Sequence, residues 1–252
     1  PSLQRGNFLD YLWNLRATRD KQNQLLLYVE DIELVHKAAL SKCDLDDGVK
    51  DGIIGNPLAC RFDPAKLTCK AGKGPQCLTK TQVDAVTQLY ASPMTSSGEL
   101  IYQGGYLPGS ELSWERYIKP EHRRALENRI TNFLRYNAFV PDPGPGWKLA
   151  DFDFDRDAKR LAMMDHLSAS INPDLRKFKA LGGKLIGYMG WNDHAANDFI
   201  DYYQTTENTM GGQANTQDFY RLFMLPGVNH CMGGSGAFAI DYLSYLEAWV
   251  EE

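Results

Sequence analysis

The sequence lacks a long apolar run and an excess of basic residues, and these two absences exclude several classes of protein. No stretch approaches the roughly 20 apolar residues that a membrane-spanning helix needs. Lys and Arg number 27 against 32 Asp and Glu, which leaves a net charge of -5, so we expect neither a nucleic acid nor a membrane as partner. With 43% hydrophobic and 23% charged residues, the composition predicts a soluble globular protein with a sizeable core.

The start of the chain also lacks familiar features. Pro1 follows no initiator methionine, and no signal-like charged and apolar segment comes after it. We therefore expect a fragment or a processed product of a longer protein.

Four of the five cysteines lie close together, without the His partners or Cys-x-x-Cys spacing of zinc sites. This pattern favours disulfides between Cys43 and Cys60 and between Cys69 and Cys77 over reduced thiols. Cys231 then has no partner within the chain. It is either bridged to another polypeptide or is a buried free thiol.

The order of predicted elements changes along the chain. Apolar residues at helical spacing predict helices in 8–42, 79–90 and 122–136, and the segments between them are rich in Gly, Pro and Ser. After Pro173 the pattern alternates, predicting strands at 185–191 and 219–225 and helices at 197–206 and 236–252. Such alternation is typical of a parallel sheet in an α/β fold.

An acidic loop, CDLDDGVKDGI, occupies residues 43–53. Its carboxylates repel one another unless solvent or a hard cation screens them. Calcium accepts carboxylate and carbonyl oxygens together, so a calcium site is one interpretation and a solvated acidic turn is the other. The predicted calcium ligands are the side chains of Asp44, Asp47 and Asp51 and the backbone carbonyls of Val49 and Ile53.

An acid and a base follow the two predicted strands, Asp193 in GWNDH and His230 in PGVNHC. In α/β hydrolases the acid and the histidine of the triad occupy such loops, in this order. The simpler alternative is that both residues only cap their loops. The nucleophile is missing, because Gly-x-Ser-x-Gly occurs nowhere and Ser235 comes after the histidine. We expect the remaining histidines, His194 among them, to be surface or packed residues.

These motifs together resemble the tannase and feruloyl esterase family. The resemblance rests on the acidic loop, CRFDP at 60–64, CLTKTQ at 77–82, GGKLIGYMGWND at 182–193 and LPGVNHCMGG at 225–234. It implies an α/β-hydrolase core with a large inserted lid domain, a structural calcium held by the acidic loop, and catalytic roles for Asp193 and His230. It also implies that Cys231 pairs with a cysteine that immediately precedes the nucleophilic serine.

The chain departs from the family pattern because it has no Cys-Ser pair. We therefore expect a partner segment or subunit, N-terminal in origin, that carries the nucleophile and is linked through Cys231. The predicted organisation is a partial core at 1–53, the lid at 54–178 and the rest of the core at 179–252. The expected function is hydrolysis of aromatic or phenolic esters in a secreted or periplasmic enzyme, and the alternative is a calcium-stabilised subunit that binds a ligand without catalysis.

Overall fold

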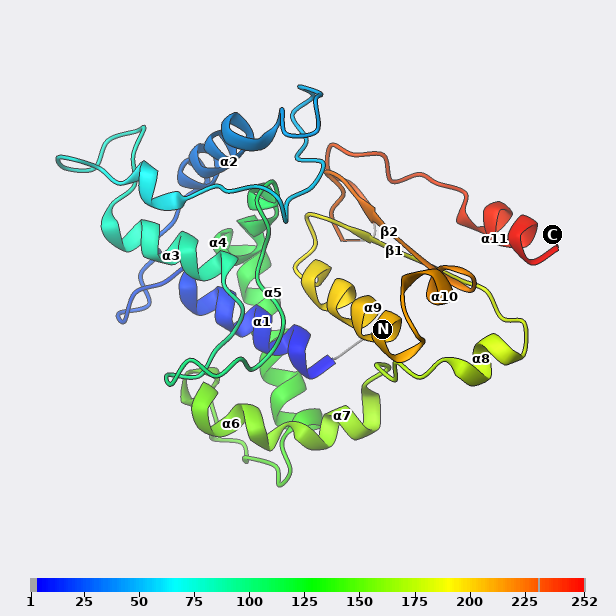
Figure 1. Cartoon of the computed structure of the whole chain (residues 1–252). Helices are drawn as coiled ribbons and strands as arrows, with labels where there is room; N and C mark the ends of the chain where they lie inside the picture. Colours follow the sequence, from blue (N-terminus) through cyan, green and yellow to red (C-terminus); the bar gives the residue numbers. More distant parts are fainter. Residues whose placement is uncertain (1–3, 231, 252) are drawn as a thin grey trace.

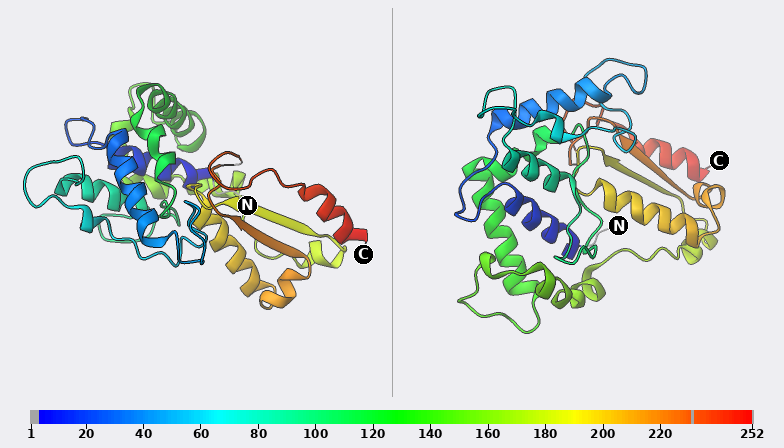
Figure 2. Two further views of the ribbon diagram at one scale, coloured as in Figure 1. Left: turned by 90° about the horizontal axis from the view of Figure 1, so that it is seen from above. Right: turned by 60° about the vertical axis from the view of Figure 1, so that its left-hand side comes forward.

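The computed structural model describes residues 4–230 and 232–251. A body of helices forms one side of the molecule, and a sheet with its own helices forms the other (Figure 1). The view from above separates the same two parts (Figure 2). None of the helices in the described ranges combines the length and apolar character that crossing a bilayer requires.

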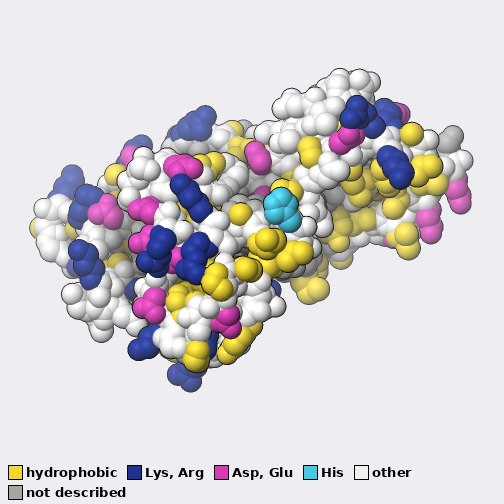
Figure 3. All heavy atoms as spheres, turned by 90° about the horizontal axis from the view of Figure 1, so that it is seen from below, with side chains coloured by type: hydrophobic (Ala, Val, Ile, Leu, Met, Phe, Trp, Pro, Cys, Tyr) yellow, Lys and Arg dark blue, Asp and Glu magenta, His cyan; other side chains and the backbone are white. Residues whose placement is uncertain are grey.

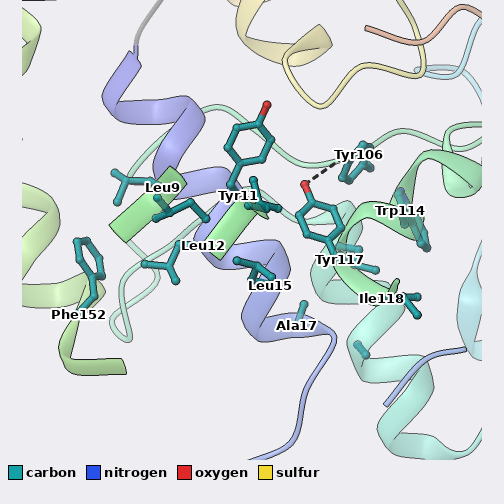
Figure 4. Close-up of a cluster of buried hydrophobic side chains, with 14 of the residues drawn as sticks. Leu9, Tyr11, Leu12, Leu15, Ala17, Tyr106, Trp114, Tyr117, Ile118 and Phe152 are labelled. Atoms are coloured by element: carbon teal, nitrogen blue, oxygen red, sulfur yellow. Dashed lines mark hydrogen bonds between the residues drawn. The ribbon is translucent and has the colours of Figure 1, made fainter. Parts of the chain in front are cut away.

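The helical body is built around α1 (Gln4–Ala17), whose apolar residues at helical spacing point into one shared core. Figure 4 shows Tyr106, Trp114 and Tyr117 on one side of α1 and Phe152 on the other, with Leu9 and Leu12 toward Phe152, so the helix is packed on both sides. The other helices of the body are α2 (Val29–Cys43), α3 (Lys80–Tyr90), α4 (Glu115–Ile118), α5 (Pro120–Phe133), α6 (Phe154–Arg160) and α7 (Ala162–Ser168). Residues on both sides of position 53 belong to this core, and the predicted domain boundaries stay a prediction.

The sheet consists of two parallel strands in the described residues, β1 (Leu185–Gly190) and β2 (Tyr220–Leu225). The connection between them contains α9 (Ala196–Thr209) and α10 (Gln213–Gln217), and α9 packs against the sheet. Gly190 pairs with Leu225 at the carboxyl ends of the strands. The loops that follow the two strands therefore leave the same edge of the sheet.

The sheet side keeps much apolar surface exposed. Tyr188 on β1 and Phe223 on β2 are 45% and 47% exposed, although strands of a parallel sheet are ordinarily buried on both faces. A groove of about 290 Å³ lies between β2 and α11 (Tyr242–Glu251), lined by apolar side chains that include Phe223 and Trp249. Figure 3 shows hydrophobic side chains gathered over this half of the molecule.

Most predicted elements are confirmed, and the differences have local causes. The helix predicted from 79 begins with a capping box, in which Gln82 N donates to the Thr79 hydroxyl and Thr79 N donates to Gln82. The helix expected from residue 236 begins only at Tyr242, because Gly236 packs against the backbone of Pro226. The helix expected over 122–136 starts at Pro120 and ends at Phe133, followed by a π turn.

Several short elements were not predicted. They are α4, α6, α7, α10 and the 3₁₀ turns at Pro64–Leu67, Glu111–Trp114 and Leu149–Asp151, whereas α8 (Arg176–Ala180) is the helix that the double Gly at 182–183 predicts before β1. Helix α6 is capped by the Asp153 side chain, which accepts from the backbone N–H groups of Asp155 and Arg156.

Candidate active site

The loop after β1 holds Asp193 in a fixed position. Trp191 N donates to the carbonyl of Leu225, and Asn192 N donates to that of Val228, so this loop is hydrogen-bonded to the loop after β2. The Asp193 carboxylate is completely buried, and its Oδ1 accepts a hydrogen bond of 3.0 Å from Ala195 N. The acid is thus immobilised at the carboxyl edge of the sheet.

The loop after β2 brings His230 to this acid. Two backbone hydrogen bonds, Asn229 N to Gly233 O and Gly236 N to Gly227 O, fold the loop back on itself. His230 Nδ1 lies 2.6 Å from Asp193 Oδ2. The imidazole is 59% exposed. The structure therefore brings the two predicted residues into direct contact and leaves much of the imidazole accessible.

Asp193 and His230 each favour the charged form of the other. The hydrogen bond to Asp193 raises the pKa of His230, partly offset by burial and by the cations of Arg116 and Arg129. Burial raises the pKa of Asp193, but hydrogen bonding to His230 and the adjacent imidazoles outweigh it, so the net pKa is lowered. An ionised Asp193 fixes the imidazole with its proton on Nδ1, and Nε2 is then free to accept a proton.

A cleft of about 810 Å³ reaches His230 from the helical body. Its aromatic wall consists of Phe8 on α1 and Phe133 on α5, whose rings stack with centroids 3.7 Å apart. Arg116 and Arg129 line it as well, and the guanidinium of Arg129 lies 5.7 Å from the Phe8 ring centroid. The site thus combines an acid–base pair with a cleft whose lining includes aromatic rings and two guanidinium groups.

Sequence reasoning missed part of the cleft wall. His194 was expected to be only a surface or packed residue, and it is buried, but it lines the cleft together with Tyr11 and His122. Its position beside Asp193 in the sequence was the available signal. Nothing local in the sequence indicated that Tyr11, far away along the chain, would meet it.

The nucleophile is not found beside the base. Among the described residues, no hydroxyl group is hydrogen-bonded to Nε2 of His230. Ser235 lies instead in a second pocket, between the acidic loop and the loop after β2, together with Ile53.

The acidic loop is ordered by its own carboxylates. Asp44 Oδ1 accepts from Gly52 N at 2.9 Å, Asp47 Oδ1 from Val49 N at 2.9 Å and Asp51 Oδ1 from Ile53 N at 3.0 Å. These bonds leave the second oxygen of each carboxylate free of a hydrogen bond to the described residues. No three His, Cys, Asp or Glu side chains in the described ranges converge as metal ligands, so a calcium cage here needs the backbone carbonyls as well.

The end of the acidic loop touches the loop that carries the base. A Cβ placed on Gly227 would lie 3.2 Å from Cγ2 of Ile53. The order of the acidic loop can therefore affect the position of His230, three residues after Gly227.

The two predicted disulfides are confirmed. Cys43 and Cys60 are joined with their Cα atoms 5.6 Å apart, and Cys69 and Cys77 with theirs 4.9 Å apart. The first bond closes the segment that contains the acidic loop. The predicted bridge through Cys231 lies outside the described residues.

The fold and the site define a class of protein. A parallel sheet whose carboxyl edge bears an acid and a histidine in this order is the C-terminal part of an α/β-hydrolase fold. The model of the tannase and feruloyl esterase family matches residues 5–252. The chain belongs to this family.

Comparisons with individual proteins agree with this assignment. The chain is 34% identical to mono(2-hydroxyethyl) terephthalate hydrolase of Piscinibacter sakaiensis, over 88% of the chain and 43% of that protein. It is 32% identical to probable feruloyl esterase B of Emericella nidulans, over 90% of the chain and 45% of that protein. The chain thus spans less than half the length of these curated relatives.

Solved structures show the same relation. Feruloyl esterase B from Aspergillus oryzae superposes with a TM-score of 0.81 at 26% identity, covering 98% of this chain and 53% of that one. Tannin acyl hydrolase from Aspergillus niger gives a TM-score of 0.75 at 18% identity, covering 98% and 50%; at this identity the likeness concerns the fold alone.

Proposed function

We propose that this chain supplies the acid and the base of a serine esterase that hydrolyses aromatic or phenolic carboxylic esters, such as feruloyl or galloyl esters. The observation that carries the proposal is the 2.6 Å contact between His230 Nδ1 and Asp193 Oδ2 at the end of an aromatic cleft. The names of the relatives, feruloyl esterase and mono(2-hydroxyethyl) terephthalate hydrolase, support an ester substrate with an aromatic acid.

The reaction is an acyl transfer in two steps. Nε2 of His230 takes the proton of a serine hydroxyl as its oxygen attacks the ester carbonyl carbon, and then gives that proton to the leaving alcohol. In the second step His230 takes a proton from water, whose oxygen attacks the acyl-enzyme and releases the acid, and the proton returns to the serine. Asp193 remains ionised throughout and stabilises the imidazolium.

The serine belongs, in this proposal, to an N-terminal segment or subunit that is linked through Cys231. Three observations support such a partner: the sequence contains no Cys-Ser pair, the chain covers 43% and 45% of two relatives, and side chains on both strands are half exposed. Apolar strands of this partner would bury Tyr188 and Phe223 and the groove beside α11.

Calcium has a structural role in this proposal. Asp44, Asp47 and Asp51 would hold it with the carbonyls of Val49 and Ile53, and it would neutralise the repulsion among the three carboxylates. The free oxygens of the acidic loop and the disulfide that closes it fit this donor set. The helical segment 54–178 would act as a lid, since α4 and α5 line the cleft. The two disulfides favour an oxidising compartment, secreted or periplasmic.

The rival function is a calcium-stabilised subunit that binds an aromatic ligand without catalysis. The deciding experiment expresses the complete reading frame, including any sequence upstream of Pro1, and measures hydrolysis of methyl ferulate and methyl gallate. The proposal expects hydrolysis that His230→Ala abolishes. Hydrolysis that survives His230→Ala would refute the assignment of the base, and the absence of hydrolysis with retained ligand binding would favour the rival.

A further inference from the structure

A second acid–imidazole–hydroxyl series lies in the wall of the cleft. The hydroxyl of Tyr11 is 2.7 Å from Nε2 of His194, and Nδ1 of His194 is 3.6 Å from Oδ2 of Asp10. All three residues are less than 10% exposed, and Tyr11 and His194 line the cleft that reaches His230. The proposed acyl transfer makes no use of this series.

The His194 side chain has an unsatisfied nitrogen. Nδ1 is buried without a hydrogen-bond partner among the described residues, and such a group costs about 1–3 kcal/mol unless its surroundings compensate. The carboxylate of Asp10 faces it. Asp10 already accepts from Gly105 N at 3.3 Å and from Asn14 Nδ2 at 2.9 Å, which is an environment of donors that suits a carboxylate.

The position of the proton on His194 sets the direction of the hydrogen bonds. Burial lowers the pKa of His194 to about 4 and raises that of Asp10 to about 7, so at pH 8 the ring carries one proton and Asp10 is ionised. A proton on Nδ1 faces the carboxylate of Asp10, and Nε2 then accepts the hydroxyl proton of Tyr11. The Tyr11 oxygen is left with lone pairs for the cleft. Nε2 also lies 3.7 Å from Oδ1 of Asp193, but it has the Tyr11 hydroxyl as its partner in either tautomer. Among the described residues Nδ1 faces only the Asp10 carboxylate, so a proton on Nδ1 is the arrangement that gives both nitrogens a complementary neighbour.

The ring of Tyr11 is held from several sides. Phe8 meets it edge to face with centroids 6.3 Å apart, and the guanidinium of Arg116 lies 6.0 Å from its centroid. Figure 4 shows its hydroxyl directed away from the packed side chains of α1. Tyr11 therefore offers one oxygen at a defined place in the cleft.

We infer that Asp10 and His194 orient Tyr11 so that its oxygen accepts a hydrogen bond from a hydroxyl group of the ester substrate. This inference rests on the proposed function. Tyr11 is then a specificity-determining residue, and His194 and Asp10 are positioning residues that act through it. The substrate hydroxyl can belong to the aromatic acid or to the alcohol, and the substrates of the test separate these two sources.

The test compares matched esters in the complete protein at pH 8. Methyl 4-hydroxycinnamate against methyl cinnamate probes a hydroxyl on the acid, and hydroxyethyl benzoate against ethyl benzoate probes one on the alcohol. For each pair, the quantity measured is kcat/KM for the hydroxylated ester divided by kcat/KM for the ester without the hydroxyl. Tyr11→Phe should lower this ratio by about 3–10-fold for one of the two pairs, which corresponds to the loss of one hydrogen bond. The ratio for the other pair should not change.

Two further variants separate positioning from general damage. His194→Leu should lower the same ratio, and the double variant Tyr11→Phe/His194→Leu should lower it no further, because both changes remove one interaction. His194→Gln keeps an acceptor for the Tyr11 hydroxyl, so its kcat/KM ratio should lie between those of His194→Leu and the wild type. Tyr106→Phe is the control: it removes a buried hydroxyl that bonds Tyr117 outside the cleft, and should leave both ratios unchanged.

The pH dependence of the ratio gives a second readout. Burial raises the pKa of Asp10 to about 7, and a protonated Asp10 would donate to Nδ1 and reverse the tautomer. The other charged or titratable groups facing His194 are Arg116, Arg129, Asp193 and His230. Protonation of His230 affects both esters of a pair equally and cancels in the ratio. The preference for the hydroxylated ester should therefore weaken as the pH falls through about 7.

Equal losses on both esters of each pair, or ratios that do not respond to Tyr11→Phe, would overturn the inference. Binding of the same esters, measured by NMR titration, keeps the test independent of turnover. If hydrolysis is absent but Tyr11→Phe selectively weakens binding of a hydroxylated ester, the proposed function fails and this inference stands. If hydrolysis requires His230 but neither the binding nor the kcat/KM ratio depends on Tyr11, only this inference fails.

Discussion

Replacing Gly190 by alanine should separate the acid from the base. Gly190 ends β1 and packs against the backbone of the loop that carries His230. An added Cβ would collide with the carbonyl oxygen of Val228 and lie 2.6 Å from that of Asn229. Both neighbours are backbone atoms, so no side chain can rotate away to make room.

The size of the effect follows from this overlap. Moving the Asn229 carbonyl from 2.6 Å to an ordinary contact distance of 3.4 Å requires a displacement of about 0.8 Å, immediately before His230. Overpacking of this kind costs about 1–3 kcal/mol, which corresponds to a fall in Tm of about 2–12 °C for a domain of this size. A misplacement near 1 Å in a catalytic group lowers turnover by about 100-fold.

Three measurements check this prediction. Thermal unfolding gives Tm, NMR titration gives the pKa of His230, and ester hydrolysis by the complete protein gives kcat/KM. The pKa of His230 should move down toward its ordinary value as the contact with Asp193 lengthens. Gly146→Ala is the control, since a Cβ there meets nothing within 4 Å. The reasoning is refuted if Gly190→Ala and Gly146→Ala have the same Tm and the same His230 pKa.

Three shorter predictions concern the pair, the acidic loop and the core. Asp193→Asn should lower the pKa of His230, because the hydrogen bond to Asp193 is the main cause of its elevation. The pair should stabilise the fold fully between the ordinary pKa of Asp and the ordinary pKa of His, and its contribution should be lost as pH rises through the raised pKa of folded His230 or falls through the lowered pKa of folded Asp193; NMR and unfolding titrations of both proteins test this. EDTA should lower the Tm of the wild type, and Asp47→Asn should remove that response whereas Asp46→Asn, in the same loop, should not; an unchanged wild-type Tm with EDTA counts against calcium. Trp114→Ala should cost about 3–5 kcal/mol of unfolding free energy because its side chain is fully buried, as denaturant unfolding would measure.

The acid and the base were predictable because local signals determine their positions. KLIGYMGW and FYRLFML are apolar runs of strand length, and the helix between them favours a parallel pair. Once the strands are parallel, the loops containing Asp193 and His230 must leave the same edge of the sheet. The disulfides were equally accessible, because the four clustered cysteines allow few pairings.

The cleft wall was not predictable, because it depends on contacts between distant parts of the chain. Tyr11 and His194 are 183 positions apart, and no periodicity links a residue on α1 to the loop after β1. The short helices α6 and α7 were not predictable for another reason: each is only seven residues long, which is too short for apolar periodicity to identify a helix.

The acid–base pair and the wall of the cleft depend on different kinds of contact. Asp193 and His230 are held by backbone hydrogen bonds between two loops of the sheet, which depend little on side-chain identity. Phe8, Arg116 and Arg129 reach the cleft from α1, α4 and α5, whose positions depend on the packing of the helical core. Under the proposed function, substitutions on the cleft-facing sides of these helices should therefore change the preferred ester while the contact between Asp193 and His230 is retained. Repacking of the core should move the substrate relative to that pair.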